Sequence, residues 1–384
     1  MSVIVRARLY AVALPLREPF TISGGTMAMR RSLIVELTDT HGNRGFGESA
    51  PFELPFYSSE TFASARSCLV DLLLPSIIGR AVDRPEACRD QMEILARGNR
   101  MAKAGVETAW WDLLAARKRI SLAELVSRRL AELGVAEKMR VQRGHLECGV
   151  ALGIPPAEDP GILAQWVRDA IASHYRRIKI KIRPGWDEEP VRVTQEAMRK
   201  AGVALPLWAD ANGAYRLDRD EAALRALDRF GLLFLEQPLS EDALQDSVAL
   251  GRMIHTPICF DESLVSDEVA RQILSMDGPR IWNIKIQRVG GLEEACRIYA
   301  RATAEGVALW GGTMPETGLG AQAMLALGGF AGFVYPSDVE PSERWYQDGR
   351  DLVPLIMEPD GVMRIPTIRV IPDLARALLV SELG

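Results

Sequence analysis

The sequence predicts an α/β fold: a modified (β/α)8 barrel of the TIM type joined to a smaller α+β capping domain. Short apolar runs recur at regular intervals between Ile178 and Val307, and each is followed by a stretch with helical periodicity, which is the pattern of a parallel barrel. Antiparallel strand patterns and helical stretches precede this region, in residues 3–133. A chain of 384 residues, 48% of them hydrophobic, is long enough to bury both cores.

Residues 1–135 are expected to form the capping domain. Apolar runs predict an antiparallel meander of strands at 3–15, 33–39 and 45–49, and helical periodicity then predicts helices at 59–78, 85–97, 100–117 and 121–133. Residues 19–27, between the first two strands, are expected to form a loop. Its glycine pair Gly24–Gly25 is an ordinary turn or the hinge of a lid, and sequence alone favours the turn. The third helix is rich in small residues, which predicts close packing, with Glu107 and Asp112 as buried or half-buried polar partners.

Residues 140–336 are expected to form the barrel. Six apolar runs begin near Ile178, Leu207, Leu233, Ile258, Ile281 and Val307. With 148–152 as the first strand and 333–335 as the last, eight strands are counted. Residues 337–384, with a β-like tail at 352–371, are expected to return to the capping domain and complete it.

Composition excludes several classes of function. The net charge of −5 gives no sign of a nucleic-acid or anionic-membrane partner. No stretch is apolar enough for a transmembrane helix, and Arg6 and Arg8 interrupt any signal-peptide core. Five scattered cysteines in apolar patterns indicate reduced core residues. We therefore expect a cytoplasmic protein, a homo-oligomer, whose partner is a small molecule.

Three acidic residues, Asp210, Glu236 and Asp261, each end a short apolar run, and they are spaced 26 and 25 positions apart. The carboxyl ends of neighbouring barrel strands converge on one face, where such folds carry their active sites. Each acid taken alone is more simply a helix cap or a loop charge. Three at matched strand ends would repel one another unless a cation lay between them. Oxygen ligands without nearby His or Cys favour Mg²⁺ over zinc, with Mn²⁺ as an alternative.

Lysines flank these acids in the sequence. Lys179 and Lys181 alternate on the predicted second strand and therefore point to the same side, into the barrel, while Lys285 lies on the predicted sixth strand, across from them. They could be simple ion-pair partners of the acids. The alternative is chemistry: a metal-bound carboxylate has an acidic α-proton, and its removal by a neutral lysine gives an enediolate. One lysine on each face would racemise the α-carbon, whereas one lysine acting twice on the same face would give a syn dehydration.

These residues, in this order, resemble those of the enolase superfamily in its muconate-lactonising subgroup. Active sites of that superfamily use Lys or His bases with Mg²⁺. The segments 19–26, 47–49, 55–61, 102–107, 283–291 and 342–346 further resemble the o-succinylbenzoate synthase and N-succinylamino acid racemase family. The resemblance covers essentially the whole chain. It implies that Asp210, Glu236 and Asp261 bind Mg²⁺ and that Lys181 is the acid/base catalyst, tuned by Lys179. Lys285 is then the opposite acid/base or a stabilising cation.

The same resemblance suggests substrate contacts. Arg288 matches an arginine associated with racemisation, and its alternative is a surface arginine at a helix start. The segment 312–320 resembles one that lines the substrate pocket, although Pro315 replaces an expected leucine. The segment 99–103 likewise differs from a His-bearing version of its motif. The full set of expected substrate contacts is Asn212, Arg288, Gly312, Met314, Glu316, Ser23, Phe56 and Tyr57.

Three activities follow as expectations. The leading one is o-succinylbenzoate synthase, the syn dehydration of 2-succinyl-6-hydroxy-2,4-cyclohexadiene-1-carboxylate in menaquinone biosynthesis. The second is N-succinylamino acid racemase, alone or together with the first. The third is a dipeptide epimerase or cycloisomerase, although Asp338-Val339-Glu340 lacks the Asp-x-Asp pair expected of the epimerase. A non-catalytic scaffold would be expected to have lost an acid or a lysine, and none is missing.

Overall fold

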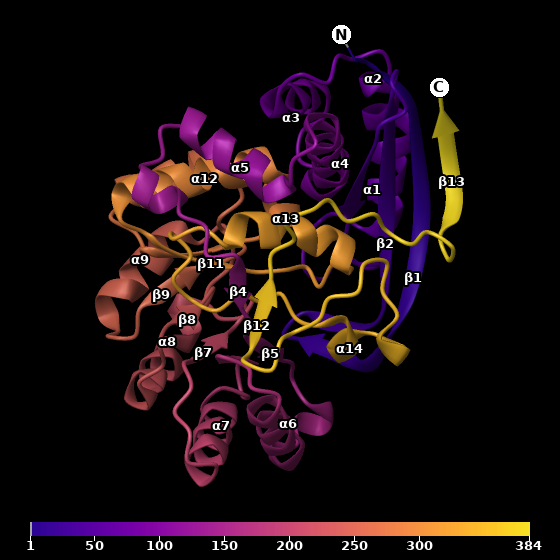
Figure 1. Ribbon diagram of the computed structural model, residues 1–384. Coiled ribbons are helices and arrows are strands. Elements are labelled where there is room, and N and C mark those ends of the chain that lie inside the picture. Colours follow the sequence, from indigo (N-terminus) through magenta and orange to yellow (C-terminus); the bar gives the residue numbers. More distant parts are fainter. Residues whose placement is uncertain (1) are drawn as a thin grey trace.

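The computed structural model describes residues 2–384, which form a capping unit beside a curled parallel sheet (Figure 1). The capping sheet is antiparallel, with strands in the order β13-β1-β2-β3. Its strands are β1 (Ile4–Ile22), β2 (Gly25–Asp39), β3 (Arg44–Ser49) and β13 (Leu378–Leu383). The last strand of the chain, β13, is therefore an edge strand of this sheet and pairs with the first strand, β1.

The first hairpin is longer than expected. Residues 19–27 were predicted to form a loop, but β1 and β2 stay paired to their ends, down to Ile22 opposite Gly25. A register shift between Pro15 and Phe20 explains why the strand pattern looked interrupted, since proline cannot donate a ladder hydrogen bond. The glycine pair is thus part of a hairpin turn. A Cβ at Gly25 would lie 2.6 Å from the ring of Phe56, so glycine allows the hairpin to approach that ring.

Helices cover one side of the capping sheet. The predicted helix at 59–78 is divided by a π-helical stretch, and the other three lie within a few residues of their predicted bounds. The helices are α1 (Phe62–Cys68), α2 (Leu74–Ile77), α3 (Pro85–Leu95), α4 (Arg100–Lys118) and α5 (Leu122–Glu132). The close packing expected of α4 is confirmed, since a Cβ at Gly47 of β3 would lie 2.3 Å from the carbonyl oxygen of Gly105.

The second sheet is all parallel, with its strands in the order β11-β10-β9-β8-β7-β6-β5. These strands are β5 (Val150–Leu152), β6 (Ile178–Lys181), β7 (Leu207–Asp210), β8 (Leu235–Glu236), β9 (Ile258–Phe260), β10 (Ile281–Ile284) and β11 (Ala308–Gly311). The helices between and after them are α6 (Pro160–Ala172), α7 (Glu188–Lys200), α8 (Leu217–Ala226), α9 (Leu244–Met253), α10 (Asp267–Ser275), α11 (Ile286–Val289), α12 (Leu292–Glu305) and α13 (Gly318–Gly328). Each connection returns the chain to the next position of the same sheet, as in a TIM-type barrel.

The eighth barrel position is not a strand, which corrects the prediction at 333–335. It consists of two parallel bridges, from Phe333 to Leu309 and from Ser337 to Cys148, which join β11 back to the residues before β5. Pro336 lies between them and has no N–H to donate, so the hydrogen-bond ladder is interrupted there. The barrel nevertheless closes, because the N–H of Gly149 donates to the carbonyl of Ser337 at 2.7 Å.

The C-terminal segment returns to the cap through a different stretch from the one predicted. Within 352–371 the chain is mostly irregular, because prolines recur at Pro354, Pro359 and Pro366, and only β12 (Val362–Arg364) pairs, with β4 (His145–Glu147). It is β13 that joins the cap sheet, antiparallel to β1. In Figure 1 this C-terminal segment crosses from the barrel to the outer edge of the cap. A short helix, α14 (Ser342–Trp345), precedes it.

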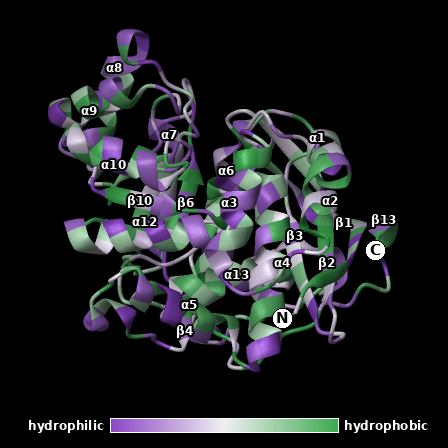
Figure 2. Ribbon diagram, turned by 90° about the horizontal axis from the view of Figure 1, so that it is seen from above, coloured by the Kyte–Doolittle hydropathy of each residue, from purple (hydrophilic) through white to green (hydrophobic). Residues whose placement is uncertain are grey.

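Glu107 on α4 connects the two units. It is fully buried, as expected, and accepts the N–H groups of Leu292 and Glu293 at 2.7 and 2.8 Å, so a side chain of the cap satisfies the first turn of barrel helix α12. The indole of Trp111 donates to the same carboxyl group. Asp112 is half-buried and pairs with Arg369 of the C-terminal segment. Figure 2 shows hydrophilic residues gathered on α7 and α8, at the periphery away from the cap.

We expect Gly47→Ala to lower the stability of the cap. The added methyl group would overlap the backbone of α4, and overpacking of this kind costs about 1–3 kcal/mol. The measurement is the midpoint of urea unfolding. Gly42→Ala is the matched control: Gly42 has φ +78° and open space around it, so its cost is only about 1 kcal/mol of backbone strain. Equal shifts for the two variants would contradict the packing argument.

Candidate active site

Three carboxylates meet at the carboxyl ends of neighbouring strands. Asp210 ends β7, Glu236 ends β8 and Asp261 follows β9, and all three are completely buried. One oxygen from each lies within 4.8 Å of the other two. Burial, reinforced by the charge of Asp210, raises the pKa of Glu236 well above its usual range. Clustered carboxyl oxygens of this kind match the donor set of a hard divalent cation, so the residues present could hold a metal ion.

Buried polar atoms beside these carboxylates support that assignment. Oδ1 of Asn283 and Oε2 of Glu262 have no hydrogen-bond partner among residues 2–384. Asn283 uses its amide nitrogen to donate to Glu236, and Glu262 accepts from Asn212 through its other oxygen. Unpaired buried oxygens are costly, and these two could accept from a ligand or coordinate a cation at this site.

Lysine amines surround the carboxylates. On β6, Nζ of Lys181 lies 2.5 Å from Oδ2 of Asp210, and Nζ of Lys179 lies 3.3 and 3.4 Å from Asp210 and Glu236. Lys285 follows β10, and its Nζ lies 2.7 Å from Oδ2 of Asp261. The structure therefore brings together all six of the residues expected to carry the chemistry.

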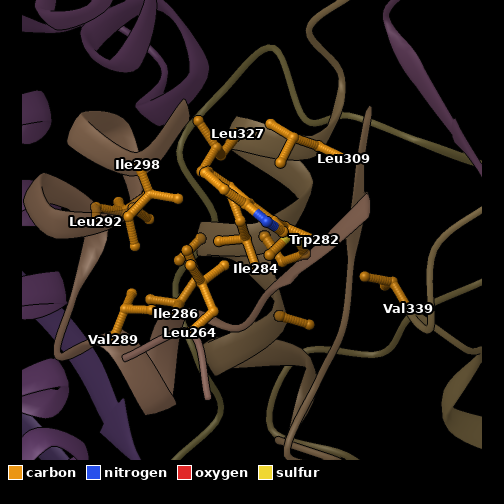
Figure 3. Close-up of a cluster of buried hydrophobic side chains, with 14 of the residues drawn as sticks. Leu264, Trp282, Ile284, Ile286, Val289, Leu292, Ile298, Leu309, Leu327 and Val339 are labelled. Atoms are coloured by element: carbon orange, nitrogen blue, oxygen red, sulfur yellow. The ribbon is translucent and has the colours of Figure 1, made fainter. Parts of the chain in front are cut away.

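Strand alternation aims Lys285 into the barrel. Trp282 and Ile284 of β10 point outward and pack with Leu292 and Leu309, as Figure 3 shows. Asn283 and Lys285 must then face the interior, because successive side chains of a strand alternate. The same rule aims Lys179 and Lys181 inward from β6.

An aromatic layer supports the charged groups inside the barrel. Trp208, Phe234, Cys259 and Trp310 form a separate buried cluster. The indole of Trp208 donates to Glu236 at 3.0 Å, and the amine of Lys179 lies 4.7 Å from the ring centroid of Trp310. These rings hold the carboxylate and the ammonium in place and keep water away from them, which strengthens the electrostatic interactions above.

Arg288 is buried, which argues against its alternative as a surface residue. It forms an ion pair with Asp261 and donates to the carbonyl oxygens of Leu264 and Asn283. Burial would raise the pKa of Asp261, but the charges of Lys285 and Arg288 outweigh it and lower the pKa to about 2. Burial likewise opposes the charge on Lys285, and Asp261 outweighs it, so the pKa of Lys285 is well above its usual value.

Several of the expected substrate contacts line a pocket beside the lysines. Asn212, Met314 and Tyr57 line it together with the three lysines, and the hydroxyl of Tyr57 accepts a hydrogen bond from Lys285 at 3.0 Å. The other expected contacts, Ser23, Phe56, Gly312, Glu316 and Arg288, do not line it. Phe56 packs on Phe52 instead, with ring centroids 4.8 Å apart. The carboxylate of Glu316 accepts a hydrogen bond from the backbone N–H of Met314. Gly312 lies against Asn283, and a Cβ at this position would be 2.3 Å from the Oδ1 atom of Asn283.

Sequence reasoning missed other residues of this pocket. Phe20 and Ile22 reach it from β1, and Trp345 reaches it from α14. The signal for Phe20 and Ile22 was the period-two alternation at the end of β1, in a stretch that was predicted to be a loop. Thr313, Asp338 and Glu340 supply polar groups. Asp338 accepts from Lys179 at 2.6 Å and also pairs with Arg177.

No helix of residues 2–384 is long and apolar enough to cross a membrane.

We expect Asp338→Asn to destabilise the protein, because it would remove the negative charge that pairs with the buried cations Arg177 and Lys179. Breaking a buried ion pair costs about 3–5 kcal/mol. Burial would raise the pKa of Asp338, but Arg177 and Lys179 lower it below its ordinary value of 3.8. The stabilisation that ionised Asp338 gives the folded protein is therefore fully present above about pH 3.8 and is lost as the pH falls through the lower pKa of the folded state. Urea unfolding between neutral and acid pH measures both effects. Asp348→Asn, at an exposed site, is the control and should change little.

Comparison with known proteins assigns the family. A model of the mandelate racemase / muconate lactonizing enzyme N-terminal domain matches residues 4–127, and an enolase C-terminal domain-like model matches 162–368. An o-succinylbenzoate synthase of Geobacillus kaustophilus is 39% identical over 91% of this chain and 88% of its own. An N-succinylamino acid racemase of Thermus thermophilus is 38% identical over 94% and 91%.

Solved structures agree with this assignment. A member of the enolase superfamily from Listeria innocua superposes with a TM-score of 0.86 at 31% identity, covering 100% of this chain and 99% of its own. A superfamily member from Enterococcus faecalis gives 0.84 at 32%, covering 99% and 98%. The chain is therefore a member of the enolase superfamily, in the mandelate racemase and muconate lactonizing enzyme family.

Proposed function

We propose that this enzyme removes the proton α to a carboxylate with the help of Mg²⁺ and that its main reaction is that of o-succinylbenzoate synthase, in menaquinone biosynthesis. The observation that carries the proposal is the placement of Lys181 and Lys285 on opposite sides of the three carboxylates. The o-succinylbenzoate synthases of Geobacillus kaustophilus and Bacillus subtilis, at 39% and 36% identity, support this choice of reaction. Five buried, unpaired cysteines support a cytoplasmic location.

The divalent cation would be held by Asp210, Glu236 and Asp261. When bound, it supplies positive charge that stabilises the negative charge developing on the substrate carboxylate. Mg²⁺ is the proposed ion because the donors are all carboxylate oxygens, with Mn²⁺ as an alternative. Asn212 and Asn283 orient the site by donating to Glu262 and Glu236, respectively.

In the dehydration, Lys181 takes the α-proton as a neutral amine. The bond from the β-carbon to its hydroxyl group then breaks, and Lys181 returns the same proton to the departing oxygen, so the products are the aromatic acid and water. Lys285 remains an ammonium ion on the other face and stabilises the negative charge. Asn212, whose Oδ1 lies 2.9 Å from the amine of Lys181, holds that amine in position.

A second activity, N-succinylamino acid racemase, is favoured by the same pair of lysines. If Lys181 removes the α-proton and Lys285 delivers another to the opposite face, the carbon is inverted without loss of any group. Tyr57, 3.0 Å from Lys285, is positioned to orient that amine. The racemase of Thermus thermophilus, at 38% identity, supports this second reaction.

We expect Mg²⁺ to raise the melting temperature. At about 100-fold excess over its Kd a ligand adds about 2.7 kcal/mol, or roughly 3 °C for a chain of this size. Glu236→Gln should remove the rise because it removes a ligand charge, whereas Lys181→Ala should keep it because the three carboxylates remain. Differential scanning calorimetry provides the measurement. An undiminished rise in Glu236→Gln would place the cation elsewhere.

The two reactions are separated by substitution of the lysines. Lys181→Ala should lower both activities by about 10²–10⁴-fold, the usual contribution of a general acid or base. Lys285→Arg keeps a positive charge but cannot act as a base, so it should abolish racemisation and retain much of the dehydration. Dehydration is followed by ultraviolet absorbance, and racemisation by α-proton exchange of N-succinyl-phenylalanine in D₂O. Full activity of Lys181→Ala in both assays would refute the assignment.

A further inference from the structure

Lys285 lies at the start of a helix that is too short to set its own direction. It directly follows β10 and is the N-cap residue of α11, which comprises only Ile286–Val289. Gly290 and Gly291, with φ +94° and +134°, end this single turn. An isolated helix of this length is not stable in water, so the direction of α11 is decided by what its side chains contact. The path of the backbone at Lys285 therefore depends on those contacts.

Arg288 and two apolar side chains attach this turn to the barrel. Ile286 and Val289 belong to the main hydrophobic core (Figure 3). Arg288 forms an ion pair with Asp261 and donates to the carbonyl oxygen of Leu264. These polar contacts hold one side of α11 against the loop that follows β9.

Gln287 attaches the other side of the same turn to the cap. Its side chain is 1% exposed, its Nε2 donates to the carbonyl oxygen of Glu48 at 2.7 Å, and its Oε1 accepts the N–H of Ala50 at 3.0 Å. Glu48 belongs to β3, an edge strand of the cap sheet, and Ala50 follows that strand. The amide thus bonds to the backbone on both sides of Ser49 and uses both its donor and its acceptor. A buried amide satisfied in this way fixes α11 relative to β3.

The cap segment that Gln287 grips leads to the tyrosine that contacts Lys285. The carboxyl group of Glu48 accepts two N–H groups at the N-terminal end of α13, and Arg30 donates to the carbonyl oxygen of Pro51 at 2.9 Å. Residues 48–51 are therefore held from several sides. The chain continues from there to Tyr57, whose hydroxyl lies 3.0 Å from the amine of Lys285. The two partners of that contact come from the cap and from the barrel, and Gln287 connects the segments that carry them.

The other lysine is held in a different way. Lys181 is the last residue of β6, which is paired with β5 on one side and with β7 on the other. Its amine is further held by Asp210 and Asn212. Lys285 lies one position beyond the end of β10, outside the ladder of that strand. The position of Lys181 thus follows from the sheet, whereas that of Lys285 follows from the attachments of α11.

We propose that Gln287 is a positioning residue for Lys285. By fixing α11 to residues 48–50 of the cap, it holds the amine of Lys285 at the face of the substrate opposite to Lys181. Gln287 does not line the pocket and touches no reacting atom. Proton transfer through Lys285 depends on it, and proton transfer through Lys181 does not. The inference rests on the proposed function, which supplies the roles of the two lysines.

The test follows α-proton exchange in D₂O separately for the two enantiomers of N-succinyl-phenylalanine, by NMR with Mg²⁺ present. Lys181→Ala and Lys285→Arg identify the enantiomer whose exchange each lysine begins. Gln287→Met has a side chain of the same length without the two hydrogen bonds. It should slow the exchange that depends on Lys285 by about 10–10²-fold, the effect of a small misplacement of a catalytic group, and leave the exchange that depends on Lys181 largely unchanged. The fall should appear in kcat rather than KM, because no contact with the substrate is lost.

The ratio of the two exchange rates separates positioning from stability, because partial unfolding lowers both rates equally. Gln287→Asn keeps the amide but is one methylene shorter, so it cannot reach both backbone groups and should change the ratio less than Gln287→Met does. Gln195→Met is the matched control. Gln195 is half-buried on α7 and donates to the carbonyl oxygen of Phe230 at 2.6 Å, far along the chain from either lysine. Its loss should leave the ratio at the wild-type value.

Amide hydrogen exchange of the protein without substrate gives a second readout. Gln287→Met should speed exchange at Ala50, which loses its acceptor, and in residues 285–291, while residues 178–181 of β6 keep the wild-type rate. An unchanged ratio of the two substrate rates in Gln287→Met would overturn the inference. Failure of the proposed function looks different, since the wild type would then exchange neither enantiomer and dehydrate nothing. Amide exchange would in that case decide alone, and unchanged rates in residues 285–291 would overturn the inference.

Discussion

The burial of three carboxylates at consecutive strand ends is the constraint on which the rest of this structure depends. Asp210, Glu236 and Asp261 are completely desolvated, and like charges so close together cannot persist without positive charge between them. The barrel supplies that charge through lysines from the flanking strands. The ammonium groups lie on the same oxygens that would hold a divalent cation, as in the 2.5 Å contact of Lys181 with Asp210. Cation binding and the availability of the lysine amines are therefore linked through shared ligands.

The cap contributes to the same site from outside the barrel. Tyr57 contacts Lys285, and Phe20 closes the pocket from the end of β1. These contacts require the cap to keep a constant position, and Glu107 provides one reason that it does. Its carboxyl group satisfies the first turn of α12, which comes after Lys285 and the short helix α11. A buried polar contact therefore ties the cap to the part of the barrel that carries this lysine.

The chemistry of the site was easier to predict than its walls. Strand periodicity placed Asp210, Glu236 and Asp261 at strand ends, and a strand end has a defined direction in a parallel barrel, so the convergence of these residues followed. Phe20 and Trp345 could not be assigned in the same way, because they reach the pocket from the cap and from the C-terminal segment. Their positions depend on how separate units pack. The interrupted strands, at Pro15 and Pro336, also show that proline can break a ladder without ending the path of the chain.

The two sides of the pocket have different consequences for function. Removal of an α-proton is common to dehydration and racemisation, so the acids and lysines around the α-carbon cannot by themselves favour one reaction. What differs is the group next to the α-carbon and the face presented to Lys285, and both depend on how the remainder of the substrate is held. In the proposed reactions that remainder would extend toward β11, the eighth barrel position and β5, where Pro315, Glu340 and Ala151 line the pocket. If the proposed function holds, the choice between the two reactions would therefore depend on the side of the barrel that carries none of the proposed metal ligands.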